Sequence, residues 1–321
     1  MTRPDVLMLG PMLPDTMEKL DAAFTVHKIW EASDPEAALR EVAPRIRGIA
    51  LSTSSTRRAD TALFDLLPGL EIIAGFGVGY DNVDAAEAGR RGIIVTNTPD
   101  VLNDEVADLT LGLLIATLRQ IPQSDRYLRE GRWLEKPYPL TATLRSRKAG
   151  IIGLGRIGKA IAGRLEGFGV EIAYHGRSRQ EGVTYAYYGS LVDMAAAVDV
   201  LIAITPGGAG TRHLVNAQVL EALGPQGVLI NVARGSVVDE EALIAALKAG
   251  TILSAGLDVF EDEPRVPQEL IDMEHVVLLP HVASASVHTR NAMGQLVVDN
   301  LASWFDGRGP MTPVPETPWK S

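Results

Sequence analysis

A short glycine-rich segment, GLGRIG, limits what this chain can fold into. Gly153, Gly155 and Gly158 follow the apolar run KAGII, precede the helix-like run RIGKAIA, and are followed by the strand-like run VEIAYH. In a strand–turn–helix unit of this kind the first glycine allows the tight turn, the second lets backbone approach a pyrophosphate, and the third allows close helix packing. The segment therefore predicts a dinucleotide-binding unit, with a strand-to-helix turn that binds nothing as the alternative.

The end of the next strand carries GRSR in place of the usual acidic residue. An acidic side chain there would accept hydrogen bonds from the adenosine ribose and repel a 2′-phosphate. Arg177, Ser178 and Arg179 instead offer guanidinium groups and a hydroxyl, which suit a phosphate dianion. These residues favour NADPH as cofactor; the alternative is that they are solvated loop residues. The cofactor-binding residues predicted from both segments are Gly153, Leu154, Gly155, Arg156, Ile157, Gly158, Gly176, Arg177, Ser178 and Arg179.

Apolar strand-like runs alternate with amphipathic runs along the whole chain, and this alternation predicts parallel sheets. The first series of strands is expected at residues 5–10, 25–30, 48–52, 70–76 and 93–97, with helices near 15–22, 34–45 and 60–67. A long helix is expected at 103–118. The second series begins with the glycine segment and continues at residues 170–175, 198–204, 227–233, 252–259 and 276–281.

A final helix at about 286–304 has no place in the second sheet, and the proline-rich tail after it can return to the first domain. The fold class is therefore α/β, with two doubly wound parallel-sheet domains. We expect a Rossmann cofactor domain at residues 101–285, inserted into a flavodoxin-like substrate-binding domain formed by residues 1–100 and the return segment 286–321.

Composition narrows the possible partners. The chain has 321 residues, a net charge of −10 and no cysteine. An acidic surface argues against nucleic acid and anionic membrane as partners, and the absence of cysteine excludes disulfides and thiolate metal sites. We expect no metal site, because the histidines lack ligand spacing. With no signal-peptide pattern and no apolar stretch near the ~20 residues of a membrane span, a cytoplasmic protein acting on small molecules is expected.

Three later stretches place titratable residues directly after apolar strands: NVARGSVVDEEAL, AGLDVFEDEP and LLPHVASAS. Open parallel sheets bind ligands at the carboxyl ends of their strands. Together with GVGYDNVD, TNTPDVLNDEVADLTLGLL and GIIGLGRIGKAIA, these stretches resemble the D-isomer-specific 2-hydroxyacid dehydrogenases over nearly the whole chain. Within that family, GRSR, ALGPQGVLINVARG and VVLLPHVAS are most similar to NADPH-using glyoxylate/hydroxypyruvate reductases and to plant hydroxyphenylpyruvate reductases.

The resemblance implies three catalytic residues. Arg234 matches the arginine that binds the substrate carboxylate and carbonyl oxygen, which suits a planar guanidinium that is always charged. His281 matches the proton donor, and Glu263 matches its carboxylate partner. Hydride addition turns a carbonyl oxygen into an alkoxide that needs a proton, and an imidazolium can give one near neutral pH. A carboxylate beside an imidazole favours the protonated ring.

The resemblance also implies contacts with substrate and cofactor. The backbone amides of Val78 and Gly79 would hold the substrate carboxylate, with Leu102 on the apolar side of the pocket. On the cofactor, Thr205 and Pro206 would line the adenosine, Val232 and Ala233 would touch the nicotinamide ribose, Asp258 would accept a hydrogen bond from the carboxamide, and Ser284 is a further candidate.

Three hypotheses for function follow. The first is NADPH-dependent reduction of glyoxylate or hydroxypyruvate to the 2-hydroxy acid, the second is reduction of an aryl pyruvate such as hydroxyphenylpyruvate, and the third is a nucleotide-sensing binding protein without turnover. The loop with Thr53, Ser54, Thr56, Arg57 and Arg58 departs from related reductases, so substrate preference stays open. The aromatic arm at residues 121–140 indicates a homodimer, since an extension outside both sheets needs cover; the alternative is that it folds back on its own chain.

Overall fold

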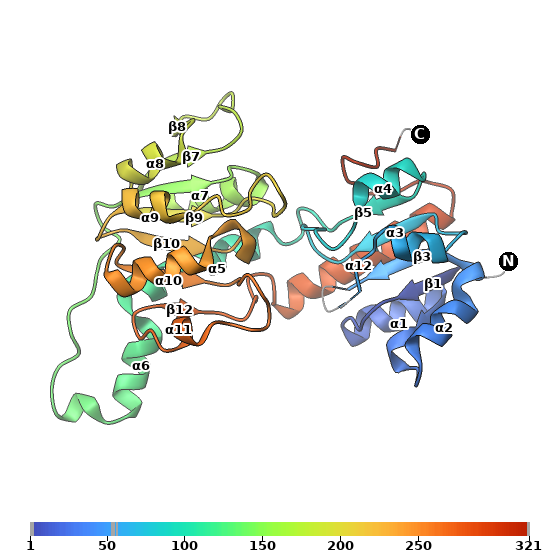
Figure 1. The fold of residues 1–321 in the computed structure, drawn as a ribbon, viewed down its shortest axis with the longest axis horizontal. Helices are drawn as coiled ribbons and strands as arrows, with labels where there is room; N and C mark the ends of the chain where they lie inside the picture. The colour runs from blue at the N-terminus through green and yellow to red at the C-terminus, as the bar shows by residue number, and fades with distance from the viewer. Residues whose placement is uncertain (1–2, 53–54, 56, 320–321) are drawn as a thin grey trace. The chain divides into compact units, whose positions relative to one another are not determined.

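The computed structural model describes residues 3–52, 55 and 57–319, and these form two compact units (Figure 1). Unit 1 extends to Leu102 and resumes at Ser286, and unit 2 is Asn103–Ala285. Each unit is built on its own parallel sheet, so the predicted α/β class with two parallel sheets is confirmed. Thr53, Ser54 and Thr56, from the loop in which substrate preference was left open, lie outside the described residues.

Unit 1 contains a five-stranded parallel sheet in the order β2-β1-β3-β4-β5, the flavodoxin-like order. Its strands are β1 (Asp5–Met8), β2 (Thr25–Lys28), β3 (Ile46–Leu51), β4 (Ile72–Gly75) and β5 (Ile94–Thr96). Its helices are α1 (Pro14–Ala23), α2 (Pro35–Val42), α3 (Thr61–Leu66), α4 (Ala85–Arg90) and α12 (Val287–Phe305), with short 3-10 turns η1 (Ile29–Glu31) and η2 (Ala43–Arg45). The register runs from Gly48 opposite Ile72 to Leu51 opposite Gly75.

The two faces of this sheet are covered by different helices. One face carries Ile49 and Ile73, which are fully buried in a core shared with α2, α3 and α4. The other face packs against α12. A Cβ built at Gly48 on this face would lie 3.2 Å from side-chain atoms of Leu301 and Phe305. The alternation of faces along β3 follows directly from the two-residue repeat of a strand.

Unit 2 contains a seven-stranded parallel sheet in the order β12-β11-β10-β9-β6-β7-β8. Its strands are β6 (Lys148–Ile152), β7 (Glu171–His175), β8 (Ala186–Tyr188), β9 (Val200–Ala203), β10 (Val228–Asn231), β11 (Ser254–Leu257) and β12 (Val277–Leu278). Strand order reverses between β6 and β9, which is the topological switch point where doubly wound sheets bind dinucleotides. The register pairs Ile152 with His175 on one side of β6 and with Ala203 on the other.

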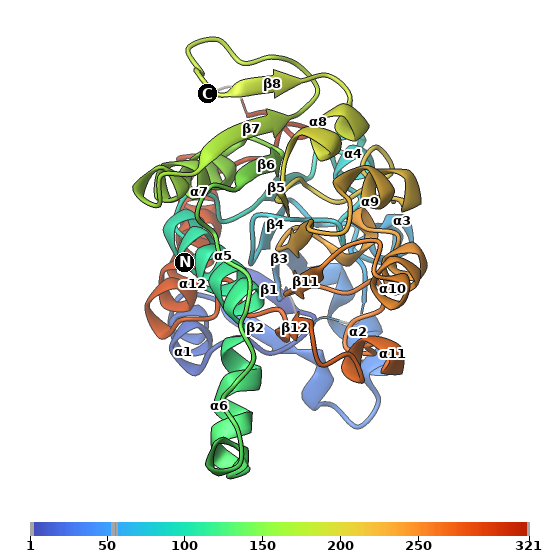
Figure 2. The same cartoon turned by 90° about the vertical axis from the view of Figure 1, so that its left-hand side faces the viewer.

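Helices cover both faces of the seven-stranded sheet, as Figure 2 shows. The helices of unit 2 are α5 (Asn103–Arg119), α6 (Ile121–Arg129), α7 (Arg156–Gly167), α8 (Leu191–Ala197), α9 (Ala217–Leu223), α10 (Glu240–Ala249) and α11 (Gln268–Ile271), with 3-10 turns η3 (Arg132–Leu134) and η4 (Gly235–Val237). Of these, α6 extends away from the sheet (Figure 2). Ile151 belongs to a core that includes residues of α5 and α7, whereas its neighbour Ile152 belongs to a core with α8, α9 and α10. The sheet is therefore buried on both sides, as expected of a purely parallel sheet.

Among the elements that were not expected from the sequence, three show why they were missed. The six-residue helix α4 contains a glycine and has only two buried residues, and β8 is a three-residue edge strand without a fully buried side chain. Helix α6, in the arm, buries only Tyr127. Each is short or has few apolar residues, which weakens the pattern on which prediction depends.

The longest of the helices in the described ranges is α12, and neither it nor any other described helix combines the length and apolar character that a membrane crossing requires.

Candidate active site

The glycine loop at the carboxyl end of β6 has the geometry that its sequence predicts. Gly153 has φ +99°, a conformation that favours glycine, and a Cβ there would lie 3.0 Å from the carbonyl oxygen of Ile204. A Cβ at Gly158 would overlap the carbonyl oxygen of Gly153, so only glycine lets α7 approach the turn so closely. A Cβ at Gly155, by contrast, would meet nothing within 4 Å. The second glycine thus borders open space beside bare backbone, which fits a pyrophosphate.

Helix α7 begins at this loop without a side-chain cap. Its N-cap residue is Gly155, whereas α8, α9 and α10 on the same sheet are capped by the side chains of Ser190, Asn216 and Asp239. The first amide groups of an uncapped helix need another acceptor, and the helix dipole favours an anion there. The missing side-chain cap at α7 therefore coincides with the place where the phosphate groups of the cofactor are expected.

The arginine loop after β7 is exposed and held at its base. Arg177, Ser178 and Arg179 are all exposed, and in the described part of the chain no carboxylate pairs with either arginine. The hydroxyl of Tyr187 donates to the carbonyl of Gly176 at 3.2 Å. The loop therefore presents two unneutralised guanidinium groups on an anchored turn beside the glycine loop, as a phosphate site requires.

Gln180 joins the two cofactor loops and was missed in the sequence. Its backbone N–H donates to the Tyr174 hydroxyl at 2.8 Å, and its side-chain Nε2 donates to the carbonyl of Leu154 at 2.7 Å. Leu154 lies inside the glycine motif, so the side chain of Gln180 connects the arginine loop to the glycine loop. A lone glutamine after GRSR carries no signal in the sequence that would have indicated this contact.

The remaining predicted cofactor residues also follow strands of this sheet. Thr205 and Pro206 follow β9, and Val232 and Ala233 follow β10, where both are buried. Arg156 is the first residue of α7 and Ile157 the second. All of them lie at the carboxyl edge of the seven-stranded sheet, the edge that binds ligands in open α/β folds.

His281 and Glu263 form a direct pair at the same edge. The distance between His281 Nδ1 and Glu263 Oε2 is 2.7 Å, and the backbone N–H of Phe260 donates to the other carboxylate oxygen, Oε1, at 3.1 Å. His281 follows β12 and its side chain is 46% exposed, so the ring is supported on one side and open on the other. An imidazole held by a carboxylate and open to solvent is suited to proton transfer.

The carboxyl group of Glu263 is held in its charged form. Burial alone raises the pKa of this group, but the hydrogen bond and charge of His281, the N–H of Phe260 and the charge of Arg234 together lower its pKa below the ordinary value. The guanidinium of Arg234 is thus close enough to act electrostatically on the pair. The structure brings Arg234, Glu263 and His281 together within unit 2.

Residues at the end of β10 position Arg234. The side-chain amide of Asn231, which is buried, donates to the carbonyl of Arg234 at 3.1 Å and accepts from the N–H of Ala233, also at 3.1 Å. A Cβ at Gly235 would overlap the backbone of Phe260, so the Arg234 turn lies directly against the segment leading to Glu263. Asn231 was missed as a site residue, although it opens the NVARG motif.

Asp258 organises the segment that carries His281. Its carbonyl accepts from the N–H of His281 at 2.8 Å, and its two carboxylate oxygens accept from the N–H groups of Val282 and Ala283 at 2.7 and 2.9 Å. These contacts hold His281 at φ +53°, an unfavourable conformation for a side chain with a Cβ. Burial raises the pKa of Asp258 despite these N–H donors. Asp258 is fully buried and Ser284 is half-buried. The contacts of both residues with the cofactor remain predictions.

The predicted substrate residues lie in unit 1. Val78 and Gly79 follow β4 and are half-buried, and Leu102 is buried in the last turn before α5. The N–H groups of Val78 and Gly79 make no hydrogen bond to any residue in the described part of the chain. Two neighbouring backbone donors are therefore available to an anion, as the sequence predicts for a substrate carboxylate.

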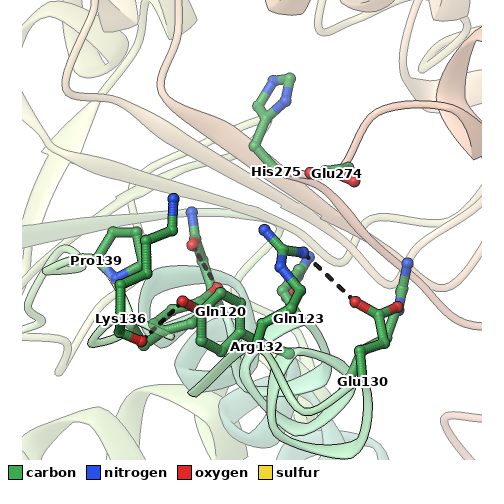
Figure 3. A pocket seen from close by; sticks show the side chains of 11 residues that line it. Gln120, Gln123, Glu130, Arg132, Lys136, Pro139, Glu274 and His275 are labelled. Carbon is green, nitrogen blue, oxygen red and sulfur yellow. Dashed lines mark hydrogen bonds and ion pairs between the residues drawn. The ribbon is translucent and has the colours of Figure 1, made fainter. Parts of the chain in front are cut away.

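A cavity of about 310 Å³ lies elsewhere in unit 2, between the arm and the residues before β12. Figure 3 shows Arg132, Lys136 and Glu130 on one side of it and His275 with Glu274 on the other. These last two residues precede β12, whereas His281 follows it, so the cavity belongs to the opposite edge of the sheet from the catalytic pair. In the ranges described, no three metal-ligating side chains are grouped to hold an ion.

The two parallel sheets, the dinucleotide loop and the carboxylate-backed histidine define an oxidoreductase of the nicotinamide-dependent class. Residues 111–283 match the family described as D-isomer specific 2-hydroxyacid dehydrogenase, NAD binding domain. The chain belongs to the D-isomer-specific 2-hydroxyacid dehydrogenase family, as its motifs predict.

Named relatives resemble the chain along nearly its whole length. It is 46% identical over 309 residues to the hydroxyphenylpyruvate reductase of Plectranthus scutellarioides, and equally to glyoxylate/hydroxypyruvate reductase A of Arabidopsis thaliana; each alignment covers 96% of this chain and 98% of the relative. A crystal structure of the NADPH-dependent glyoxylate/hydroxypyruvate reductase of Sinorhizobium meliloti, in complex with NADP and malonate, is 52% identical with a TM-score of 0.92, covering 100% of this chain and 99% of that one.

Proposed function

We propose that this protein reduces small 2-keto acids, glyoxylate or hydroxypyruvate, with NADPH, and that it yields the D-2-hydroxy acid where the product is chiral. The observation that carries the proposal is the pair of His281 Nδ1 and Glu263 Oε2, 2.7 Å apart, on the sheet edge that also bears the dinucleotide loop. A proton donor on a cofactor-binding edge is the arrangement that carbonyl reduction requires.

His281 is the proton donor in this proposal. Bound NADPH supplies the hydride that reaches the carbonyl carbon. Because Nδ1 of His281 is engaged by Glu263, Nε2 is the ring nitrogen left to protonate the developing alkoxide. Arg234 bridges the carboxylate and the carbonyl oxygen, which polarises the carbonyl and fixes the substrate, and Glu263 orients the imidazole.

The arginine loop is the basis for choosing NADPH. Arg177 and Arg179 are unpaired with any carboxylate in the described ranges and lie after β7, where an acidic residue would select NADH. The fit of the loops to a dinucleotide rests on the open space at Gly155 and the uncapped start of α7. The contacts of Thr205, Pro206, Val232 and Ala233 with the cofactor belong to the same proposal.

Reduction of an aryl pyruvate is the second candidate. The relative from Plectranthus scutellarioides bears the name hydroxyphenylpyruvate reductase, and its identity to this chain equals that of the Arabidopsis relative. The two candidates share every chemical step. They differ only in how much space the pocket must leave beside the carbonyl for the rest of the substrate. Leu102 would border that room in both cases.

We further propose that the protein is a homodimer that pairs through the arm. Large apolar side chains are exposed along it: Ile121, Leu128, Trp133, Leu134 and Leu140. Such a group of exposed apolar residues needs cover, and a second copy provides it. Light scattering tests this, since a monomeric mass would refute the dimer. A cytoplasmic location stays a prediction from the sequence.

A panel of keto acids tested with both cofactors tests the proposed function. We expect loss of NADPH absorbance with glyoxylate and hydroxypyruvate, and much slower loss with NADH. Faster turnover of hydroxyphenylpyruvate would support the second candidate. NADPH binding without turnover of any keto acid would reject both and favour a nucleotide-sensing protein.

A further inference from the structure

In the backbone after β4, the carbonyl groups of Gly77 and Val78 are both held by residues that follow β5. The carbonyl of Gly77 accepts from the N–H of Thr98 at 2.8 Å, and the carbonyl of Val78 accepts from the side-chain Nδ2 of Asn97 at 2.9 Å. The N–H of Gly77 donates to the hydroxyl of Thr98 at 3.0 Å, and φ +142° at Gly77 favours glycine. The segment after β4 is therefore fastened to the segment after β5.

Peptide planarity turns these contacts into a direction for the amide groups. In a trans peptide the C=O and the following N–H point in opposite directions. Since the Gly77 and Val78 carbonyls point toward Thr98 and Asn97, the N–H groups of Val78 and Gly79 point away from them. These two N–H groups have no acceptor within the described ranges, so both are available to an anion.

The two carbonyls are held by different kinds of donor. Thr98 uses its backbone N–H, which every residue except proline has, whereas Asn97 uses its side chain, which other residues lack. The orientation of the peptide between Val78 and Gly79 therefore depends on the identity of the residue at position 97. Asn97 lies in the stretch TNTPDVLN but was not predicted as a site residue.

Asn97 is itself fixed by the C-terminal segment. Its backbone N–H donates to the carbonyl of Thr312 at 3.3 Å, and its carbonyl accepts from the Thr312 hydroxyl at 2.6 Å. Asn300 of α12 is fully buried; its Nδ2 donates to the Thr312 hydroxyl at 3.0 Å and its Oδ1 accepts from the N–H groups of Met311 and Thr312. A buried, fully used side chain thus anchors the turn that holds Asn97.

We infer that Asn97 is a positioning residue for the substrate carboxylate: its side-chain amide holds the Val78 carbonyl so that the Gly79 N–H faces the ligand. The inference rests on the proposed role of the Val78 and Gly79 amides and names the residue that sets their direction. The return segment after α12 thereby takes part in substrate binding without touching substrate.

Asn97→Ala in the full-length protein is the direct test. We expect the KM for glyoxylate to rise about tenfold, as weakening one charge-assisted hydrogen bond predicts, while kcat and the KM for NADPH stay within about twofold of wild type. Oxalate, a dicarboxylate probe that cannot be reduced, should lose affinity for the NADP-bound protein by a similar factor in calorimetry. Unchanged KM and unchanged oxalate affinity would overturn the inference.

Two further variants separate positioning from damage to the fold. Thr317→Val removes the contacts of a buried hydroxyl with the N–H and carbonyl of Val95 in the same segment, and should leave the KM for glyoxylate near wild type. Asn97→Asp keeps the shape but replaces the donor by an acceptor, and should weaken oxalate binding at least as much as Asn97→Ala. A rise in KM in Thr317→Val equal to that in Asn97→Ala would assign the effect to general loosening and contradict the inference.

The oxalate measurement also separates this inference from the proposed function. If the wild type binds oxalate but reduces no keto acid, the proposed function fails while the role of Asn97 is still tested by the variants. If the wild type turns over glyoxylate and Asn97→Ala matches it in KM and in oxalate affinity, the inference alone fails.

Discussion

His281 and Glu263 contact each other through a single short hydrogen bond, with 2.7 Å between Nδ1 and Oε2. The histidine follows β12 and the glutamate lies after β11, so two neighbouring strand ends of one sheet supply the pair. Asp258, at the end of β11, holds the backbone of the histidine segment through three contacts. The ring is thus fixed by backbone and side chain before any ligand arrives, which is the preorganisation that catalysis needs.

Glu263→Gln should change the pH dependence of reduction. Reduction needs the protonated imidazole, so its rate falls as the pH rises through the range where the ring loses its proton. His281 helps to lower the pKa of Glu263, so the two charges are coupled, and removing the carboxylate should move this fall toward lower pH. Profiles of kcat/KM against pH measure the shift.

Glu261→Gln is the matched control for this variant. Glu261 contacts Arg212 at 2.8 Å and His213 at 3.0 Å rather than His281, so its profile should match that of wild type. Because the pKa of Glu263 is lowered in the folded protein, its charged form stabilises the fold at any pH above the ordinary carboxyl pKa. This stabilisation is lost only as the pH falls through the lowered pKa. A Glu263→Gln profile identical to that of wild type would remove the carboxylate from the mechanism.

Replacing Arg177 and Arg179 together by alanine should raise the KM for NADPH about tenfold or more and hardly alter that for NADH. Charge-assisted contacts to the 2′-phosphate are lost, and NADH has no such phosphate. Steady-state kinetics with both cofactors measure the effect. Arg145→Ala, at another exposed arginine of unit 2, should change neither value. Equal effects on both cofactors would reject the assignment.

Gly158→Ala should destabilise the protein by about 1–3 kcal/mol, because its Cβ would overlap the carbonyl oxygen of Gly153 and push α7 from the turn. Gly163→Ala in the same helix meets nothing within 4 Å and should stabilise it by about 0.5–1 kcal/mol. Urea unfolding midpoints report both changes. If the two variants are equally stable, the close approach of α7 to the turn is not as described.

Much of the fold could be predicted because its strands and helices are strongly patterned. The predicted helices at 103–118 and 286–304 correspond to α5 and α12, and the strand runs correspond to the two parallel sheets. The elements β8, α4 and α6 were missed because they are short or bury few side chains, and their conformation is set by neighbours rather than by local periodicity.

The site could be predicted where motifs carry the chemistry, and could not where single side chains support it. Arg234, Glu263 and His281 lie in motifs at strand ends, and the structure gathers them within one unit. Asn231, Gln180 and Asn97 act through contacts with backbone carbonyls, so they support the motifs without supplying a reacting group. In many proteins a polar side chain forms hydrogen bonds with nearby backbone groups. The sequence alone therefore does not show which segment such a side chain holds.

His281→Ala tests the central claim most directly. Turnover of glyoxylate by saturating NADPH should fall about a hundredfold or more, the usual worth of a positioned general acid, while NADPH affinity measured by fluorescence stays unchanged. His275→Ala, at the opposite end of β12, should keep normal turnover. Turnover by His281→Ala within a few fold of wild type would contradict the account.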